Sequence, residues 1–61
     1  MQHRTPSTQF HVMIEYRTKC RLAVWYGMVA ADGVERASEI GEKLLRRRSR
    51  TLVRIDRIVV R

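Results

Sequence analysis

Apolar and polar residues alternate strictly over residues 9–17. One side of this segment carries Phe10, Val12, Ile14 and Tyr16, and the other carries His11, Met13, Glu15 and Arg17. Strict alternation is typical of a strand with one buried face, so we predict a β-strand here. Thr18-Lys19 then interrupts the apolar run and is predicted to turn the chain, although it lacks the Asn-Gly or Asp-Gly pair of a tight hairpin.

Residues 20–31 form the most apolar stretch and are rich in Val, Trp and Tyr, which favours a second strand antiparallel to the first. Its two sides carry Leu22, Val24, Tyr26, Met28 and Ala30, and Ala23, Trp25, Gly27, Val29 and Ala31. Because neither side is polar, both are expected to be covered. One helix can cover only one side, so we predict that the Trp25 side, together with Met13, is covered by a second subunit or a ligand. The alternative is that the small residues on that side leave only a modest exposed patch.

Residues 32–50 show the period of an amphipathic helix. Asp32 and Glu35 have the spacing of a capping box, in which each side chain accepts a hydrogen bond from the other's backbone amide. The apolar stripe comprises Val34, Ala37, Ile40, Gly41, Leu44 and Leu45. The opposite face is charged, with acids preceding bases in the order that the helix dipole favours. Its predicted ion pairs, spaced by four residues, are Glu39 with Lys43 and Glu42 with Arg46.

Gly41 interrupts the apolar stripe of this helix. A glycine within a helix costs about 1 kcal/mol relative to alanine, so its presence predicts a close approach by another backbone or a bulky ring. Trp25 is the candidate for that ring. The alternative is that the glycine is merely tolerated.

Residues 51–61 return to extended character. Thr51, Val53 and Ile55 alternate, whereas Ile58 and Val60 have the other parity. The phase therefore slips near Asp56-Arg57, as at a β-bulge. A helix also fits the apolar spacing, but the abundance of Val, Ile and Thr and the lack of a cap favour a strand.

The order strand, strand, helix, strand predicts an α+β fold with a small three-stranded sheet and one helix packed on one face. Residues 1–8 are polar, contain the proline Pro6 and lack periodicity, so we predict a flexible N-terminal arm. Residues 9–61 are predicted to form a single small domain.

The length of 61 residues makes a monomer marginally stable, because so small a chain buries only about 60% of its unfolded surface. One cysteine, Cys20, allows no internal disulfide, so a homodimer or a larger even-numbered oligomer is the expected source of extra stability, with Met13 and Trp25 at the interface. No long apolar run and no signal-peptide pattern is present, which predicts a soluble, cytoplasmic protein with no membrane partner.

The net charge of +7 is concentrated at the C-terminal end: residues 1–31 carry +3, residues 32–45 carry −2 and residues 46–61 carry +6. Arginine outnumbers lysine eleven to two, and its planar guanidinium suits phosphate. A helix C-terminus favours cations, but that accounts for only part of the cluster. The predicted nucleic-acid-binding residues are Arg46, Arg47, Arg48, Arg50, Arg54 and Arg57.

No catalytic constellation is recognisable. Neither histidine, His3 or His11, has the spacing of a metal site, Cys20 lacks an identifiable base, and no glycine-rich phosphate loop is present. We therefore predict a non-enzymatic protein without metal or cofactor. The expected function is a small basic homo-oligomer that contacts nucleic acid, DNA or RNA, through arginine-phosphate contacts and acts in regulation. The alternative is a structural or protein-interaction module whose arginines contact another subunit or an acidic protein partner.

Overall fold

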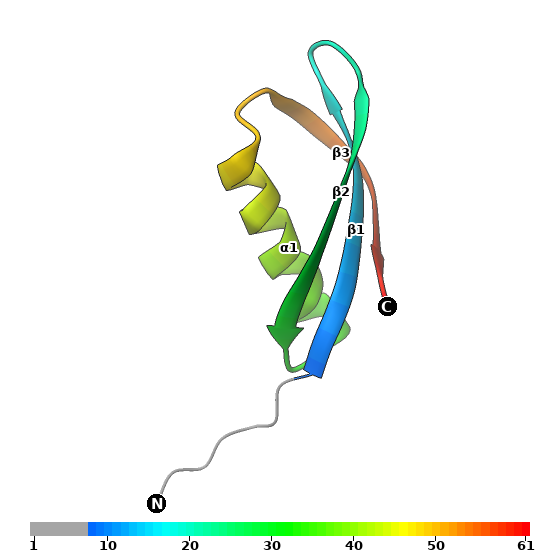
Figure 1. Cartoon of the computed structure of the whole chain (residues 1–61), viewed down its shortest axis with the longest axis vertical. Coiled ribbons are helices and arrows are strands. Elements are labelled where there is room, and N and C mark those ends of the chain that lie inside the picture. Colours follow the sequence, from blue (N-terminus) through cyan, green and yellow to red (C-terminus); the bar gives the residue numbers. More distant parts are fainter. Residues whose placement is uncertain (1–7) are drawn as a thin grey trace, which may run out of the picture.

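The computed structural model describes residues 8–61. It contains the strands β1 (Thr8–Thr18), β2 (Leu22–Ala31) and β3 (Leu52–Val60) and the helix α1 (Val34–Arg48) (Figure 1). The predicted α+β class and the order of elements are confirmed, and residues 52–60 form a strand rather than a helix. Except for Thr8, which begins β1, the predicted arm lies outside the described residues.

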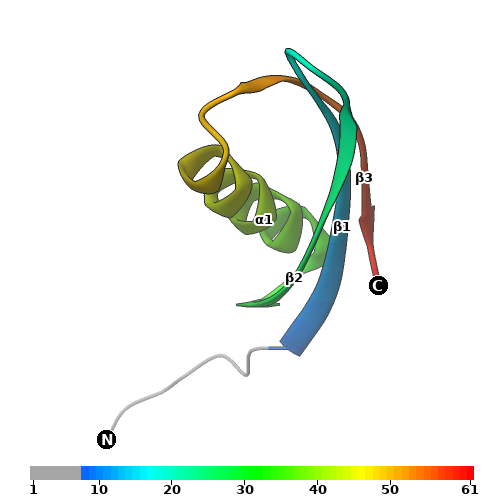
Figure 2. The same cartoon turned by 45° about the horizontal axis from the view of Figure 1, so that its top comes forward.

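The three strands form one sheet in the order β2-β1-β3, and both neighbouring pairs are antiparallel. β2 and β3 therefore run parallel to each other at the two edges, and α1 returns the chain between them. Figures 1 and 2 agree that α1 lies on one face of the sheet, while no described element covers the other. The uncovered face is called the open face below.

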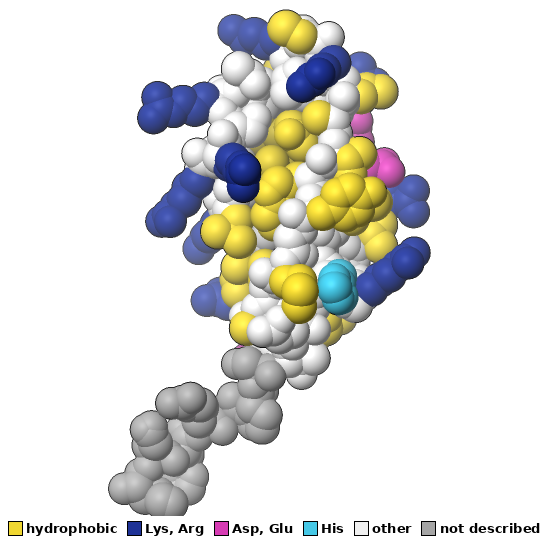
Figure 3. All heavy atoms as spheres, viewed as in Figure 1, with side chains coloured by type: hydrophobic (Ala, Val, Ile, Leu, Met, Phe, Trp, Pro, Cys, Tyr) yellow, Lys and Arg dark blue, Asp and Glu magenta, His cyan; other side chains and the backbone are white. Residues whose placement is uncertain are grey.

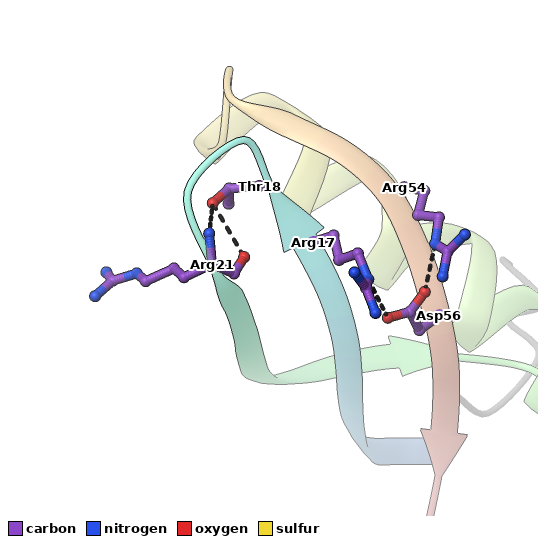
Figure 4. Close-up of polar contacts among 5 residues, drawn as sticks. All are labelled: Arg17, Thr18, Arg21, Arg54 and Asp56. Carbon is purple, nitrogen blue, oxygen red and sulfur yellow. Dashed lines mark hydrogen bonds and ion pairs between the residues drawn. The ribbon is translucent and has the colours of Figure 1, made fainter.

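A short loop joins β1 to β2. Thr18 stands opposite Arg21, and its N–H donates a hydrogen bond of 2.9 Å to the carbonyl of Arg21. The Thr18 hydroxyl donates to the same carbonyl and accepts from the N–H group of Arg21 (Figure 4). It also accepts from the N–H group of Cys20. The loop has no glycine of the kind that tight hairpins favour. Hydrogen bonds from the threonine side chain to the backbone stabilise it instead.

β3 contains the predicted phase slip. Glu15 stands opposite Arg57 and Tyr16 opposite Ile55, so Asp56 is an extra residue in the ladder. A second irregularity lies between Arg17 and Thr18, where Val53 is the extra residue. The bulge at Asp56 turns Ile58 and Val60 to the face that already carries Ile55, which explains why the apolar residues of β3 change parity.

The core lies between α1 and the sheet. Each of β1, β2 and α1 contributes two buried side chains to it: Val12, Ile14, Val29, Ala31, Ala37 and Leu45. Fully burying a Val, Leu or Ile side chain contributes about 1.5–3 kcal/mol, and four of these six residues are of that kind. So small a core leaves little to offset the entropy lost when the chain is ordered. The partly buried residues that pack around them include Phe10, Tyr16, Trp25, Ile55 and Ile58.

Gly41 marks a close approach, as the sequence predicts, but the nearest group is the side chain of Val12 and not a backbone or the ring of Trp25. A Cβ atom added to Gly41 would lie 2.8 Å from Cγ1 of Val12 and 3.6 Å from Cζ3 of Trp25. The nearest atom thus belongs to β1, and the ring of Trp25 lies just beyond it. The missing side chain lets α1 approach the sheet at this point.

The capping box predicted at the start of the helix does not form. The helix begins at Val34 with Gly33 as N-cap and no side-chain cap hydrogen bond, so Asp32 and Glu35 do not form a capping box. The first helical hydrogen bond runs from the Ala37 N–H to the Gly33 carbonyl, which places Asp32 one residue too early to cap.

Of the two predicted ion pairs on the helix, one forms. Arg46 contacts Glu42 at 3.0 Å, whereas Glu39 contacts Arg36 at 3.2 Å instead of Lys43. Glu39 thus pairs with the arginine three residues before it. Both spacings bring side chains together on one helix face.

The prediction that Trp25 and Met13 share the uncovered side is also wrong. Trp25 stands opposite Ile14 in the sheet and packs around the core under α1, while Met13 stands opposite Tyr26 on the open face. The alternation of β1 fixes this, because neighbouring side chains in a strand point to opposite faces. Contact of either residue with a second subunit stays a prediction.

Candidate nucleic-acid interface

The fold separates the six arginines predicted to bind nucleic acid. Arg46, Arg47 and Arg48 form the last turn of α1, and Arg50 follows in the connection to β3. Arg54 and Arg57 lie further along, in β3. The helix-end arginines lie on the α1 side of the sheet, whereas Arg57 stands opposite Glu15, a residue of the open face. They therefore do not form one continuous edge.

A groove of about 770 Å³ lies between the end of α1 and the β1–β2 hairpin. The antiparallel course of the chain creates it: β2 runs away from the hairpin, and α1 runs back and ends near it (Figure 1). Three arginines line the groove, Arg21 from the hairpin and Arg48 and Arg50 from the helix end. The remaining lining residues include the aromatic side chains of Tyr16 and Trp25.

The groove is electropositive. No carboxylate lines it, and none of its three arginines takes part in an ion pair within residues 8–61. The negative end of the helix dipole explains cations in the last turn of α1, including Arg48. It does not explain Arg21, which lines the groove from the β1–β2 hairpin. Cations from separate segments facing one hollow indicate a surface suited to an anion.

Arg21 is the residue that the sequence prediction omitted. Arg21 could have been identified from the direction of the chain through the predicted elements, but not from the local composition. A helix that follows an antiparallel hairpin and packs on it must end near the hairpin loop, so loop cations and helix-end cations meet.

Two of the predicted arginines are already engaged with carboxylates. Arg46 pairs with Glu42, and Arg54 donates to the carboxylate of Asp56 at 2.8 Å. Arg17 approaches the other oxygen of Asp56 at 3.5 Å, so that the bulged aspartate lies between two arginines (Figure 4). These contacts make Arg46 and Arg54 weaker candidates for binding a phosphate.

The open face carries a second group of surface residues. A hollow there is lined by His11, Met13, Tyr26, Arg57, Val59 and Arg61. Beside it, β2 exposes the large apolar side chains of Leu22, Val24, Tyr26 and Met28. Figure 3 shows hydrophobic side chains along the middle of the molecule, where β2 lies in the same view in Figure 1, with Lys and Arg side chains at both margins.

No group of three His, Cys, Asp or Glu side chains among residues 8–61 could hold a metal ion, and Cys20 is exposed in the hairpin. Within the same part of the chain, no helix has the length and apolar character needed to cross a membrane. The groove itself combines guanidinium groups and aromatic rings with the thiol of Cys20 and the hydroxyls of Thr18, Ser49 and Thr51.

No protein-family model matches the chain, and neither a curated protein nor a solved structure is significantly similar to it.

Proposed function

We propose that this protein binds nucleic acid and that the groove at the helix end holds the phosphate backbone through Arg21, Arg48 and Arg50. The observation that carries this proposal is the convergence of three arginines, without a carboxylate among them, from two separate segments. Arg47, in the same last helical turn, adds to the local positive charge. Arg57 would contact a strand that continues onto the open face.

A polyanion fits this groove better than an acidic protein does. Guanidinium groups donate two parallel hydrogen bonds to a phosphate, and each contact releases counterions from the nucleic acid. Tyr16 and Trp25 line the same groove, so an unpaired base can reach an aromatic side chain next to a bound phosphate. This arrangement favours single-stranded over duplex nucleic acid.

The test measures binding of fluorescently labelled single-stranded and duplex oligonucleotides over a range of salt concentrations. We expect binding at low salt and a linear fall of log K with log salt, with a slope of about −0.7 for each phosphate contacted on a single strand. The double variant Arg48→Gln/Arg50→Gln is expected to make the slope shallower by about 1.4, because it removes two such contacts.

The matched control is Arg36→Gln/Lys43→Gln, which removes the same charge from α1 outside the groove. An equal loss in both double variants would show that net charge, not the groove, drives binding. Absence of binding by the wild-type protein at low salt would overturn the proposal. Loss of assembly in Arg48→Gln/Arg50→Gln, with unchanged oligonucleotide binding, would instead favour the interaction module whose arginines contact another subunit.

A further inference from the structure

The two edges of the sheet differ in their protection against pairing with another strand. β3 has two register shifts and carries Arg54, Asp56 and Arg57, all of which hinder the approach of a further strand. β2 pairs with β1 without a register shift over ten residue pairs, and Leu22–Ala31 contains no charged residue. A long, regular and apolar edge is one that a sheet protein usually covers.

The backbone of β2 presents its free hydrogen-bonding groups in a defined order. The hydrogen bond from Thr18 to Arg21 makes these two residues a hydrogen-bonded pair, and such pairs alternate along an antiparallel ladder. His11 and Arg61 exchange hydrogen bonds of 2.8 Å in both directions, so the odd-numbered residues of β1 bond to β3 and the even-numbered ones to β2. Both observations agree. The β2 residues left with outward backbone groups are Leu22, Val24, Tyr26, Met28 and Ala30.

These five residues also place their side chains on the open face. Ala30 is exposed as well, and the other four are the exposed large apolar residues described above. Unpaired backbone groups and uncovered apolar side chains thus coincide on one strand. A partner strand at this edge would satisfy the first and shield the second.

We propose that a second copy of this chain pairs with β2, antiparallel, about a two-fold axis at Tyr26. The pairs across the axis are then Tyr26 with Tyr26, Val24 with Met28 and Leu22 with Ala30. Every outward N–H and C=O group from Leu22 to Ala30 gains a partner. The five residue pairs across the axis exchange two hydrogen bonds each, which gives ten hydrogen bonds. The result is a six-stranded sheet in which the two open faces form one surface.

The character of β2 selects a second copy over other occupants. A nucleic acid finds no cation on this strand, and an acidic or basic protein finds no charge to complement. Self-pairing places apolar side chains opposite apolar ones, whereas the same pairing of β3 would bring arginines together.

The test uses Tyr26→Lys, which sets two ammonium groups opposite each other at the axis. Tyr26 is 73% exposed in the single chain, so this substitution should leave the fold intact. Val53→Lys is the matched control, because Val53 is 59% exposed and lies in β3, away from the β2 edge. Mass is measured by light scattering during gel filtration at micromolar concentration, and folding by circular dichroism.

We expect the wild-type protein and Val53→Lys to have the mass of a dimer and a melting temperature that rises with concentration. Tyr26→Lys should be a folded monomer, and mixing it with Tyr26→Glu should restore the dimer. In the wild type, the amide protons of Val24, Tyr26 and Met28 should exchange slowly with solvent and become faster on dilution. A wild-type monomer with a dilution-independent melting temperature would overturn the proposal, as would a dimer that leaves these amides fast.

Discussion

At the scale of single residues, the contact between Gly41 and Val12 fixes the distance of α1 from the sheet. Val12 is fully buried and β-branched, so its side chain has one strongly preferred rotamer and little room to move. The contact distance of 2.8 Å for an added Cβ is shorter than side chains tolerate. The glycine is therefore required here by packing, and its cost to the helix is offset by closer burial of the core.

We predict that Gly41→Ala destabilises the protein, although alanine is the better helix former. The gain in helix propensity is about 1 kcal/mol, whereas overpacking a core costs about 1–3 kcal/mol, so the net loss should be about 1 kcal/mol. Urea unfolding at one fixed protein concentration measures it. Combining Gly41→Ala with Val12→Ala should relieve the clash. Gly41→Ala should therefore destabilise the Val12→Ala variant less than it destabilises the wild type. Additive effects of the two substitutions would contradict this packing account.

The close approach at Gly41 could be predicted from the sequence, because a glycine in an apolar helical stripe needs a reason. The side on which Trp25 lies was predicted wrongly, because it depends on how the loop pairs β1 with β2. With Thr18 opposite Arg21, even-numbered residues of β1 face odd-numbered residues of β2, which puts Trp25 beside Ile14. A loop longer by one residue would have turned the whole strand over. Face assignment therefore depends on the loop, the segment with the weakest sequence signal.

At the scale of elements, β3 illustrates what alternation can and cannot predict. The phase slip near Asp56-Arg57 is visible in the apolar pattern, and the structure has a bulge there. The position of β3 beside β1, rather than beside β2, could not be predicted, because both edges of the hairpin were open to it. The bulge also moves Asp56 between Arg17 and Arg54, a contact that no local spacing indicates.

We predict that Asp56→Asn lowers stability by about 1 kcal/mol at low salt, since each partly exposed ion pair contributes about 0.2–1 kcal/mol and two are lost. The loss should shrink at high salt, which screens exposed charges. Urea unfolding at both salt concentrations, with equal protein concentration, measures it. Glu42→Gln, which breaks a single helical pair, is the control and should cost about 0.3–0.5 kcal/mol. A loss that is independent of salt would point to the bulge backbone instead of its charges.

At the scale of the whole molecule, the groove and the β2 edge are adjacent and can act together. The groove lies on the α1 side of the sheet and is lined there by Ala23 and Trp25 of β2, whereas the outward residues of β2 place their side chains on the open face. Antiparallel pairing about Tyr26 sends the two hairpins, and with them the two grooves, toward opposite ends of the six-stranded sheet. The two Leu22 residues are then separated by eight residues along the ladder, or roughly 26 Å at about 3.3 Å per residue. One extended single strand can span this distance and contact both grooves.

The coupling of these two surfaces gives a last prediction, for the salt dependence of binding. A long single-stranded oligonucleotide that bridges both grooves should make about twice as many phosphate contacts with the dimer as with a monomer, and the second groove then binds at a high effective concentration. Tyr26→Lys should therefore bind this probe with about half the salt slope of Val53→Lys, although the two variants carry the same charge. A probe too short to reach both grooves should bind the two variants with equal slopes. Equal slopes on the long probe would show that one groove suffices for binding. Failure of every variant to bind would reject the nucleic-acid proposal, and the pairing of β2 would then be judged by the mass of the protein alone.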